Sequence, residues 1–196
     1  MTFPVKPGSE SAVADIMANY RGPATAAVRQ PSRPLLDRTS VFMAGTHVVR
    51  LVDIHCAPIE AARHLRSQPQ IQAVETLLQP HLLHGRDLSD ESGLRRFLAS
   101  AVMRVRVARP APTSRTRRHA TLYRAAPGRG RDLVALLASR FPDDASGVTL
   151  CRRRDLVIQV VETDGQPPGP LGAETDLVSG VTPMALLTDR AAGPRT

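Results

Sequence analysis

The feature that most constrains this fold is an internal repeat, in which the second part of the chain resembles the first at an offset of 120 residues. In each copy a Pro-Gly pair lies just before an amphipathic helix, and such a pair is typical of a turn. The apolar positions of the two helices match: Val13, Ile16 and Met17 in the first, and Leu133, Leu136 and Leu137 in the second. Spacings of three and four residues mark one buried helix face. The chain is therefore predicted to contain two similar halves.

Each of these helices is followed by a pattern of two β-strands around a short polar turn. β-Branched residues are enriched on both sides of the turn, in residues 39–54 of the first half and 148–162 of the second. The first half continues with a predicted helix at about Pro58–Ser67 and a last strand through Val74–Leu83. This order of strand, helix, strand, strand, helix and strand is that of a ferredoxin-like unit. The second half becomes rich in proline and glycine after Glu162, so its last helix and strand are expected to be weak or absent.

We therefore predict an α+β fold in which ferredoxin-like antiparallel sheets carry helices on one face. An open four-stranded sheet exposes its edges and its second face, and two such sheets can cover each other. The expected arrangement is a dimeric α+β barrel, formed within one chain or between the two chains of a homodimer. The alternative is two independent domains on a linker. Paired sheets are favoured because neither half has many large apolar residues with which to build its own core.

The predicted domain organisation has four parts. The first ferredoxin-like half covers residues 1–105 and includes an extra amphipathic helix at 91–103. A linker rich in proline and arginine follows at 106–117, and such a composition is typical of a solvated connection. The degenerate second half and a Pro/Gly-rich C-terminal segment complete the chain, at residues 118–163 and 164–196.

Positive charge is concentrated in one part of the sequence. The formal net charge is +8, and residues 101–154 carry 13 basic side chains against 3 acidic ones. A basic region can indicate nucleic-acid binding. Base stacking needs aromatic side chains, however, and the chain has no Trp, two Tyr and four Phe. A solvated linker is the preferred interpretation, and no nucleic-acid partner is expected.

Several other classes of protein are disfavoured. No apolar run approaches the roughly 20 residues needed to span a bilayer, and the first ten residues lack the basic start and apolar core of a secretory signal. Cys56 and Cys151 are too few for a disulfide framework or a structural zinc site. Neither G-x-G-x-x-G nor G-x-x-x-x-G-K-[ST] occurs, so no nucleotide fingerprint is present. A cytoplasmic protein with reduced thiols and no membrane partner is expected.

Six short segments of the first half share their pattern with one family of proteins. They are Phe3–Glu10, Arg38–Gly45, Val48–Asp53, Ala62–Leu65, Gln68–Glu75 and Gly85–Leu88. Together they resemble the SchA/CurD-like proteins of aromatic polyketide and spore-pigment gene clusters. The resemblance is good over roughly residues 1–105 and weak over Arg118–Glu162.

The resemblance implies a tailoring role on an aromatic polyketide made by a type II synthase. Members of this family look like relatives of the dimeric α+β barrel monooxygenases, which oxidise anthrone-like phenols to quinones without flavin, haem or metal. A deprotonated polyphenol can itself reduce dioxygen, so the protein supplies a base, an apolar pocket and a donor for the developing oxyanion. The resemblance thus implies no cofactor, O2 as co-substrate, an aromatic polyketide as ligand and contact with synthase components.

Two other functions are compatible with the same resemblance. A polyketide cyclase could fold a reactive poly-β-ketone with acid–base help alone. A non-catalytic protein could bind the synthase or sequester its product. All three functions use an apolar cavity with a base and a hydrogen-bond donor, so the sequence does not separate them.

Histidines are the natural candidates for the general base, because their unperturbed pKa is about 6.5. His64 lies at the edge of the apolar face of the predicted second helix, and His81 shares the alternation of Leu77 and Leu83 in the predicted last strand. A packing or surface role is the alternative for each. His81 and His84 would point to opposite sides of a strand, so no metal site is expected.

Arg50 is the third catalytic candidate. It shares the alternation of Val48 and Val52, where an apolar residue is expected, and a charge on an apolar face is either paired or functional. Arg50 is therefore interpreted as an edge residue or as a cation that binds a phenolate. The predicted cavity lies between the first sheet and its helices, with segment Arg21–Asp37 as a lid or a plain surface loop. Its expected substrate-binding residues are Val13, Met17, Tyr20 and Phe42, with a core role as the alternative for Tyr20.

Overall fold

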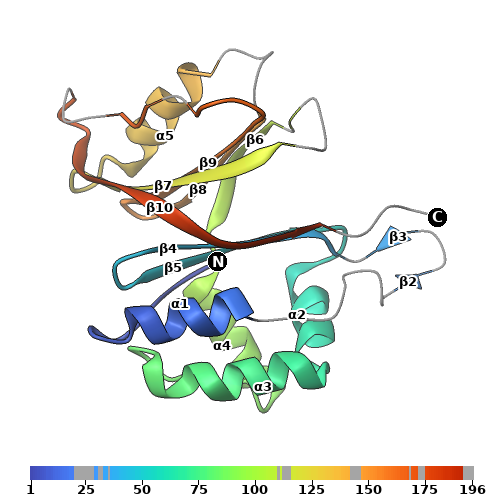
Figure 1. Ribbon diagram of the computed structural model, residues 1–196. Coiled ribbons are helices and arrows are strands. Elements are labelled where there is room, and N and C mark those ends of the chain that lie inside the picture. Colours follow the sequence, from blue (N-terminus) through green and yellow to red (C-terminus); the bar gives the residue numbers. More distant parts are fainter. Residues whose placement is uncertain are drawn as a thin grey trace. The chain divides into compact units, whose positions relative to one another are not determined.

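The computed structural model describes residues 1–19, 29–30, 33–34, 36–109, 111, 116–141, 147–167, 169–171 and 175–191 (Figure 1). The chain divides into two compact units, one of Met1–Val102 with Leu187–Thr196 and the other of Met103–Leu186. Both units combine helices with antiparallel strands, so the predicted α+β class is confirmed. In the described part of the chain, no helix is long and apolar enough to cross a membrane.

The first unit is built on an antiparallel sheet with the strand order β1-β5-β4-β10. Its strands are β1 (Thr2–Pro4), β5 (His47–Ile54), β4 (Leu36–Ala44) and the end of β10 (Val178–Ala191). The β4–β5 hairpin turns at Gly45, whose φ of +51° is a left-handed conformation that glycine adopts without a steric penalty. A separate two-stranded sheet pairs β2 (Arg29–Gln30) with β3 (Arg33–Pro34).

Helices lie on one side of this sheet (Figure 1). They are α1 (Glu10–Asn19), α2 (Pro58–Arg66), α3 (Pro69–Leu78), the 3-10 turn η2 (Gln79–His81) and α4 (Glu91–Ala101). Proline occupies the first turn of α2 and of α3, where its missing N–H costs no helical hydrogen bond. One apolar core is formed by buried side chains of α1, α3, β1, β4 and β5 and by the bridged pair Val5 and Leu82. Its other members are Phe3, Val13, Met17, Val41, Met43, Val48 and Leu78.

The predicted last strand of the first half, Val74–Leu83, is wrong. Residues up to Leu78 form helix α3, and Leu82 alone makes an antiparallel bridge, to Val5 beside β1. Ile71 and Leu78 are buried seven residues apart, which is the period of a helix face, whereas Leu77 and Leu83 are 58% and 48% exposed. The alternation assigned to a strand therefore belonged to a helix followed by a turn.

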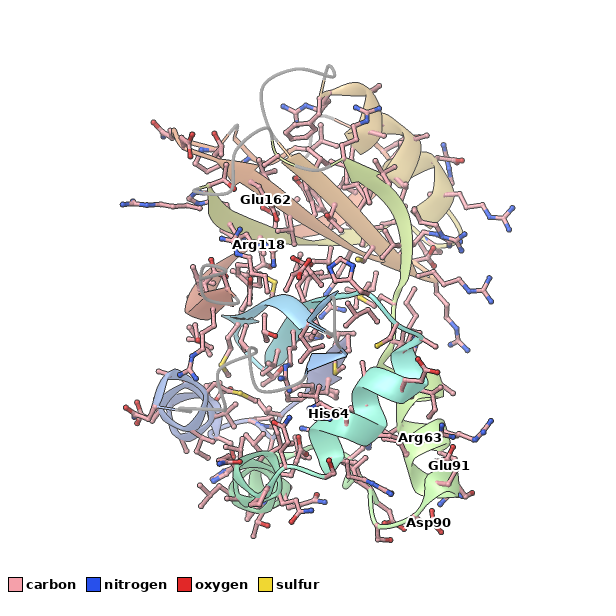
Figure 2. The ribbon with its side chains drawn as sticks, turned by 90° about the vertical axis from the view of Figure 1, so that its right-hand side faces the viewer. Arg63, His64, Asp90, Glu91, Arg118 and Glu162 are labelled. Carbon is pink, nitrogen blue, oxygen red and sulfur yellow. The ribbon has the colours of Figure 1, made fainter. Side chains whose placement is uncertain are left out.

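The second unit has the strand order β10-β7-β9-β8-β6. Its elements are β6 (Arg104–Arg109), β7 (Arg117–Ala125), α5 (Gly130–Ser139), β8 (Gly147–Arg153), β9 (Leu156–Thr163) and the first part of β10. The predicted repeat is visible in the packing, because Leu133 and Leu137 are fully buried in the second core as Val13 and Met17 are buried in the first. Between β7 and β9, Arg118 is 4% exposed and pairs with the directly opposed Glu162, Nε to Oε1 at 2.6 Å (Figure 2).

Two parts of the second unit differ from the expectation. The Pro/Gly-rich C-terminal segment contains the strand β10, in which residues 178–184 pair with β7. Pro183 and the register shift at Gly180 hide this strand in the sequence, although it is rich in apolar residues. The predicted linker begins inside β6, where Val105 and Val107 alternate with arginines and pair with β8. The arginines of β6 therefore lie on a strand, whereas residues 110 and 112–115 of the predicted linker lie outside those that the structure describes.

Asp155 in the β8–β9 turn holds the start of α5. Its carboxylate accepts hydrogen bonds from the backbone N–H groups of Gly128 and Gly130, at 3.0 and 3.2 Å. Its own carbonyl accepts from the N–H of Ala125 at 2.8 Å. One side chain therefore satisfies two donors at a helix entrance that has no other side-chain cap.

We predict that Asp155→Ala lowers the free energy of unfolding by about 1–2 kcal/mol, because the N–H groups of the exposed Gly128 and the buried Gly130 lose a charged acceptor. Urea denaturation of the full chain measures this loss. The control is Asp132→Ala, which removes an exposed ion pair with Arg129 from the same helix turn and is expected to change stability by less than about 0.5 kcal/mol. Equal losses in the two variants would contradict this account of the turn.

Candidate functional site

A cavity of about 590 Å³ opens in the first unit between α2, α3 and the segment 86–89 that precedes α4. This volume lies in the range of small-molecule sites. The lining is mixed, with apolar surface from Ile71 and Leu88. Its charged side chains are Arg63, Arg66, Glu75, Arg86 and Asp87. The cavity is therefore suited to a ligand that has both apolar and charged parts.

Helix α3 supplies one wall of the cavity because its polar residues lie on a face that adjoins its buried one. Ile71 and Leu78 are buried and anchor the helix. The polar residues Gln72, Glu75, Thr76 and Gln79 follow the i, i+3, i+4, i+7 spacing of one helix face, and all four line the cavity.

Arg86 is the most buried charge at this site. Its side chain is 8% exposed, and its Nε lies 3.3 Å from Oε2 of Glu75. The guanidinium carbon also lies 4.3 Å from the ring centroid of Phe3 and 5.1 Å from that of Phe97. Nε and Nη2 are buried and have no hydrogen-bond acceptor among the residues that the structure describes. Ring contacts and one carboxylate thus compensate a buried cation whose in-plane donors are unsatisfied.

Burial and two neighbouring charges determine how strongly the Arg86 guanidinium holds its proton. Burial lowers the pKa of the Arg86 guanidinium, Glu75 raises it, and the positive charge of Arg50 lowers it again. Arginine still remains protonated in proteins. The surroundings therefore disfavour the charge that Arg86 carries, and a further anion would stabilise it.

Hydrogen bonds to side chains of α2 and η2 hold the segment that carries Arg86. Arg66 Nη1 donates to the carbonyl of Leu88 at 3.1 Å, and the Gln79 amide donates to the carbonyl of Arg86 at 2.5 Å. The segment also passes very close to α4, where a β-carbon at Gly93 would lie 2.3 Å from the carbonyl oxygen of Asp87. The absence of a side chain at Gly93 is what allows this approach.

An ion pair joins α2 to α4 at the rim of the site. Figure 2 shows Arg63 and Glu91 facing each other from the two helices, with Nη2 to Oε1 at 2.5 Å and Nε to Oε2 at 3.0 Å. Arg95 adds a contact to the same carboxylate at 3.1 Å. The hydrogen bond from Arg63, assisted by Arg95, lowers the pKa of Glu91 to about 2. Asp90 caps α4 by accepting from the N–H of Gly93 at 2.6 Å.

Arg50 lies where the sequence predicted, on the helix-facing side of β5. It is two residues from Val48, which belongs to the helix-side core, and alternate strand residues share a face. Its charge is close enough to lower the pKa of Arg86. The predicted cation therefore lies near a second one that the sequence analysis did not single out.

The two histidine candidates lie near the site but do not line the described cavity. His64 on α2 makes a hydrogen bond to the side-chain amide of Gln68 (Figure 2). His81 in η2 makes one from Nδ1 to Oγ of Ser9 at 3.1 Å. Each is half-buried and held by a neighbouring polar side chain.

The predicted substrate-binding residues are not gathered at this cavity. Val13 and Met17 of α1 pack into the apolar core of the first unit. Phe42 is fully buried and alternates with Val41 and Met43, so it faces the other side of the sheet. Tyr20 and most of the predicted lid lie outside the residues that the structure describes.

Glu75 and Arg86 are the residues that sequence reasoning missed. Glu75 was assigned to a strand, which hid its place on the polar face of α3, and Arg86 lies in a segment without periodicity. The available signal was that both belong to segments that carried the family resemblance, Gln68–Glu75 and Gly85–Leu88. The structure brings these two segments together.

Metal and thiol chemistry have little support in the described residues. They contain no group of three or more His, Cys, Asp or Glu that could hold a metal ion. Burial raises the pKa of both free thiols, and Glu60 adds to the effect at Cys56. The two cysteines are therefore protonated near neutral pH, which disfavours a nucleophilic role.

The fold and the site together define an α+β protein of antiparallel sheets with a small-molecule-sized cavity in its helix layer. A family model described as "SchA/CurD like domain" matches residues 1–109, which is more than half of the sequence. The chain belongs to the SchA/CurD-like family.

Curated relatives come from three species of Streptomyces. The chain is 39% identical over 177 residues to "Polyketide synthase CurD" of Streptomyces cyaneus. It is 38% identical over 177 residues to "42.8 kDa protein in whiE locus" of Streptomyces coelicolor, and 36% identical over 183 residues to "Protein SchA" of Streptomyces halstedii. These alignments cover 85–88% of this chain and 44–47% of the relatives. The chain thus spans about half the length of the curated relatives it matches.

A solved structure shares the fold. It is a crystal structure from Fusobacterium nucleatum described as "Putative monooxygenase", which covers 98% of this chain and 92% of its own, with a TM-score of 0.51 and 10% sequence identity. At this identity the similarity supports the fold alone. It agrees with the predicted α+β architecture of antiparallel sheets and helices.

We predict that Gly93→Ala destabilises the chain by about 1–3 kcal/mol, although alanine is the better helix former by about 1 kcal/mol. The new methyl group must displace the Asp87 backbone, and with it the Arg86 segment. The matched control is Gly85→Ala in the same segment, where the nearest atom to a β-carbon is 4.0 Å away. Denaturant unfolding of both variants tests this, and a Gly93→Ala protein as stable as the parent would contradict it.

We also predict that Glu91 titrates near pH 2 and that Arg63→Gln moves its pKa back toward 4.5. A carboxyl whose pKa is lowered by folding stabilises the folded state above its ordinary pKa, and this contribution is lost as the pH falls toward 2. Carbon NMR of the glutamate carboxyl groups measures the titration. Arg96→Gln on the same helix is the control and should leave the Glu91 pKa unchanged. A Glu91 pKa near 4.5 in the parent protein would show that the pair does not form in solution.

Proposed function

We propose that this chain is a tailoring enzyme of aromatic polyketide biosynthesis. Its family membership supports this pathway, and one relative carries the name polyketide synthase. We further propose a cofactor-independent monooxygenase reaction, in which O2 hydroxylates or quinonises a polycyclic phenol. The observation that carries the proposal is the 590 Å³ cavity with a buried cation, Arg86, in its wall.

The chemistry suits an acidic, electron-rich ring system. An anthrone-like phenol loses a proton from its CH₂ carbon, and the resulting anion gives one electron to O2. The substrate radical and superoxide combine to form a C–O–O bond, and loss of water leaves a carbonyl. One oxygen atom enters the product and the other leaves as water, and the substrate supplies all four electrons.

Three demands on the protein follow from this sequence of steps. The substrate anion and superoxide need a fixed positive field, which Arg86 and Arg50 would supply on the helix-facing side of the sheet. The first step needs a base, for which His64 and His81 are the candidates. The ring system needs apolar contact, for which Ile71 and Leu88 lie in the cavity wall.

Oxygen labelling tests the proposed reaction. Purified full-length chain is supplied with a tricyclic anthrone under ¹⁸O₂, and the product mass is compared with that of an enzyme-free reaction. Faster formation of a quinone with one ¹⁸O atom supports the monooxygenase. A cyclase would instead remove water from a linear poly-β-ketone without any dependence on O2. No change in either substrate would leave a binding protein.

We predict that Arg50→Ala and His64→Ala each lower the rate by on the order of 10²-fold or more, because one removes a fixed cation and the other a base. Steady-state assays measure the rates, and circular dichroism checks that each variant is folded. His84→Ala is the control, since His84 is exposed whereas His64 is half-buried. Normal turnover in both test variants would place the catalytic residues elsewhere in the chain.

A further inference from the structure

The unsatisfied donors of Arg86 are a specific pair. Nε–H and the adjacent N–H of Nη2 lie in one plane on the same side of a guanidinium, and they form the fork that receives both oxygens of a carboxylate. At Arg86 these are the two atoms without a hydrogen-bond acceptor among the described residues. Oε2 of Glu75 lies 3.3 Å from Nε of Arg86, but among the described residues this oxygen also has no hydrogen-bond partner.

Two other arginines of the first unit show what this fork does when an acceptor is aligned with it. Arg38 donates from Nε and Nη2 to the two oxygens of Asp189, at 2.9 and 2.6 Å. Arg63 does the same to Glu91, at 3.0 and 2.5 Å. Arg86 is more buried than either, with 8% of its side chain exposed against 16% and 48%. The least hydrated of these three cations is therefore the one that lacks a bidentate partner.

Contacts with Phe3 and Phe97 account for the burial of the Arg86 side chain, but they do not provide acceptors for its N–H donors. A cation over a ring interacts through the face of its plane, and such contacts leave the in-plane N–H groups unsatisfied. Glu75 stands on the cavity-facing side of α3 and is 21% exposed, so its side chain has room to move away.

We propose that the cavity recognises a carboxylate on an aromatic ligand, which Arg86 binds through Nε and Nη2 after displacing the side chain of Glu75. The ring system of the ligand then lies against Ile71 and Leu88. This inference deepens the proposed function, on which it rests for the choice of an aromatic ligand, and it narrows the substrate class to aromatic acids. Glu75 acts as an internal competitor for the cation, so it lowers the affinity for acids and leaves that for neutral analogues of the same shape unchanged.

A matched pair of probes tests the inference. Anthraquinone-2-carboxylate and anthraquinone-2-carboxamide have the same rings and differ in charge. Equilibrium dialysis or calorimetry with the full chain should show tighter binding of the acid. Arg86→Gln should weaken binding of the acid on the order of 10- to 100-fold, the loss expected for a charged hydrogen-bond pair, and leave the amide nearly unchanged.

A second variant keeps the test decisive if Arg86→Gln fails to fold. Glu75→Gln retains the cation and the shape of the wall but removes the competing charge, so it should bind the acid several-fold more tightly and the amide as before. The control is Arg96→Gln, because Arg96 is exposed and does not line the cavity. Equal affinity of the parent for acid and amide, or weaker binding of the acid by Glu75→Gln, would overturn the inference.

The binding test and the oxygen-labelling test distinguish a failure of the inference from a failure of the proposed function. Preference for the acid that depends on Arg86, without any incorporation of oxygen, supports the inference and contradicts the proposed monooxygenase. Oxygen incorporation into a neutral anthrone, with no preference for the acid, supports the proposed function and overturns the inference.

Discussion

Burial of α3 in the helix layer of the first unit, beside α1 and α2, is the interaction on which the site depends. Leu78 is fully buried and Ile71 nearly so, and these two residues fix the rotation of the helix about its own axis. The neighbouring face then presents Glu75 and Gln79 to the cavity. Gln79 in turn hydrogen-bonds the backbone of Arg86. An apolar contact thus sets the position of the charged groups.

The charge of Arg86 is the energetic exception in this layer. A helix-covered sheet face is apolar because burial of charge is costly. Here the cost is reduced by two aromatic rings and one carboxylate, and Arg50 on the same side of the sheet increases it. Proteins retain such an arrangement most readily where a ligand completes it. The site is therefore best understood as a cation that is positioned before its anion arrives.

The cavity lies in the part of the chain that matches the SchA/CurD-like family. The family match covers residues 1–109, which include every residue of the cavity wall. The second unit repeats the first part of this order of strands and helix. In the place of α2 and α3 it has the stretch between β9 and β10, where the described residues form no helix. The two units thus share the first part of the pattern and differ in the second.

The sequence by itself determined the local elements. Val13, Met17, Leu133 and Leu137 identified two equivalent buried helix faces, and alternation in the hairpins placed Arg50 on the helix side of its sheet. These features depend on periodicity, which records the face that a residue occupies.

Only the tertiary structure decided which elements meet. It placed Leu82 in a single bridge beside β1, paired β10 with β7, and brought Glu75 on α3 to Arg86. Periodicity says which face of an element is buried but not what buries it. Arg86 in particular lies in a segment without repeating structure, and its role depends on groups that come from β1, α3 and α4.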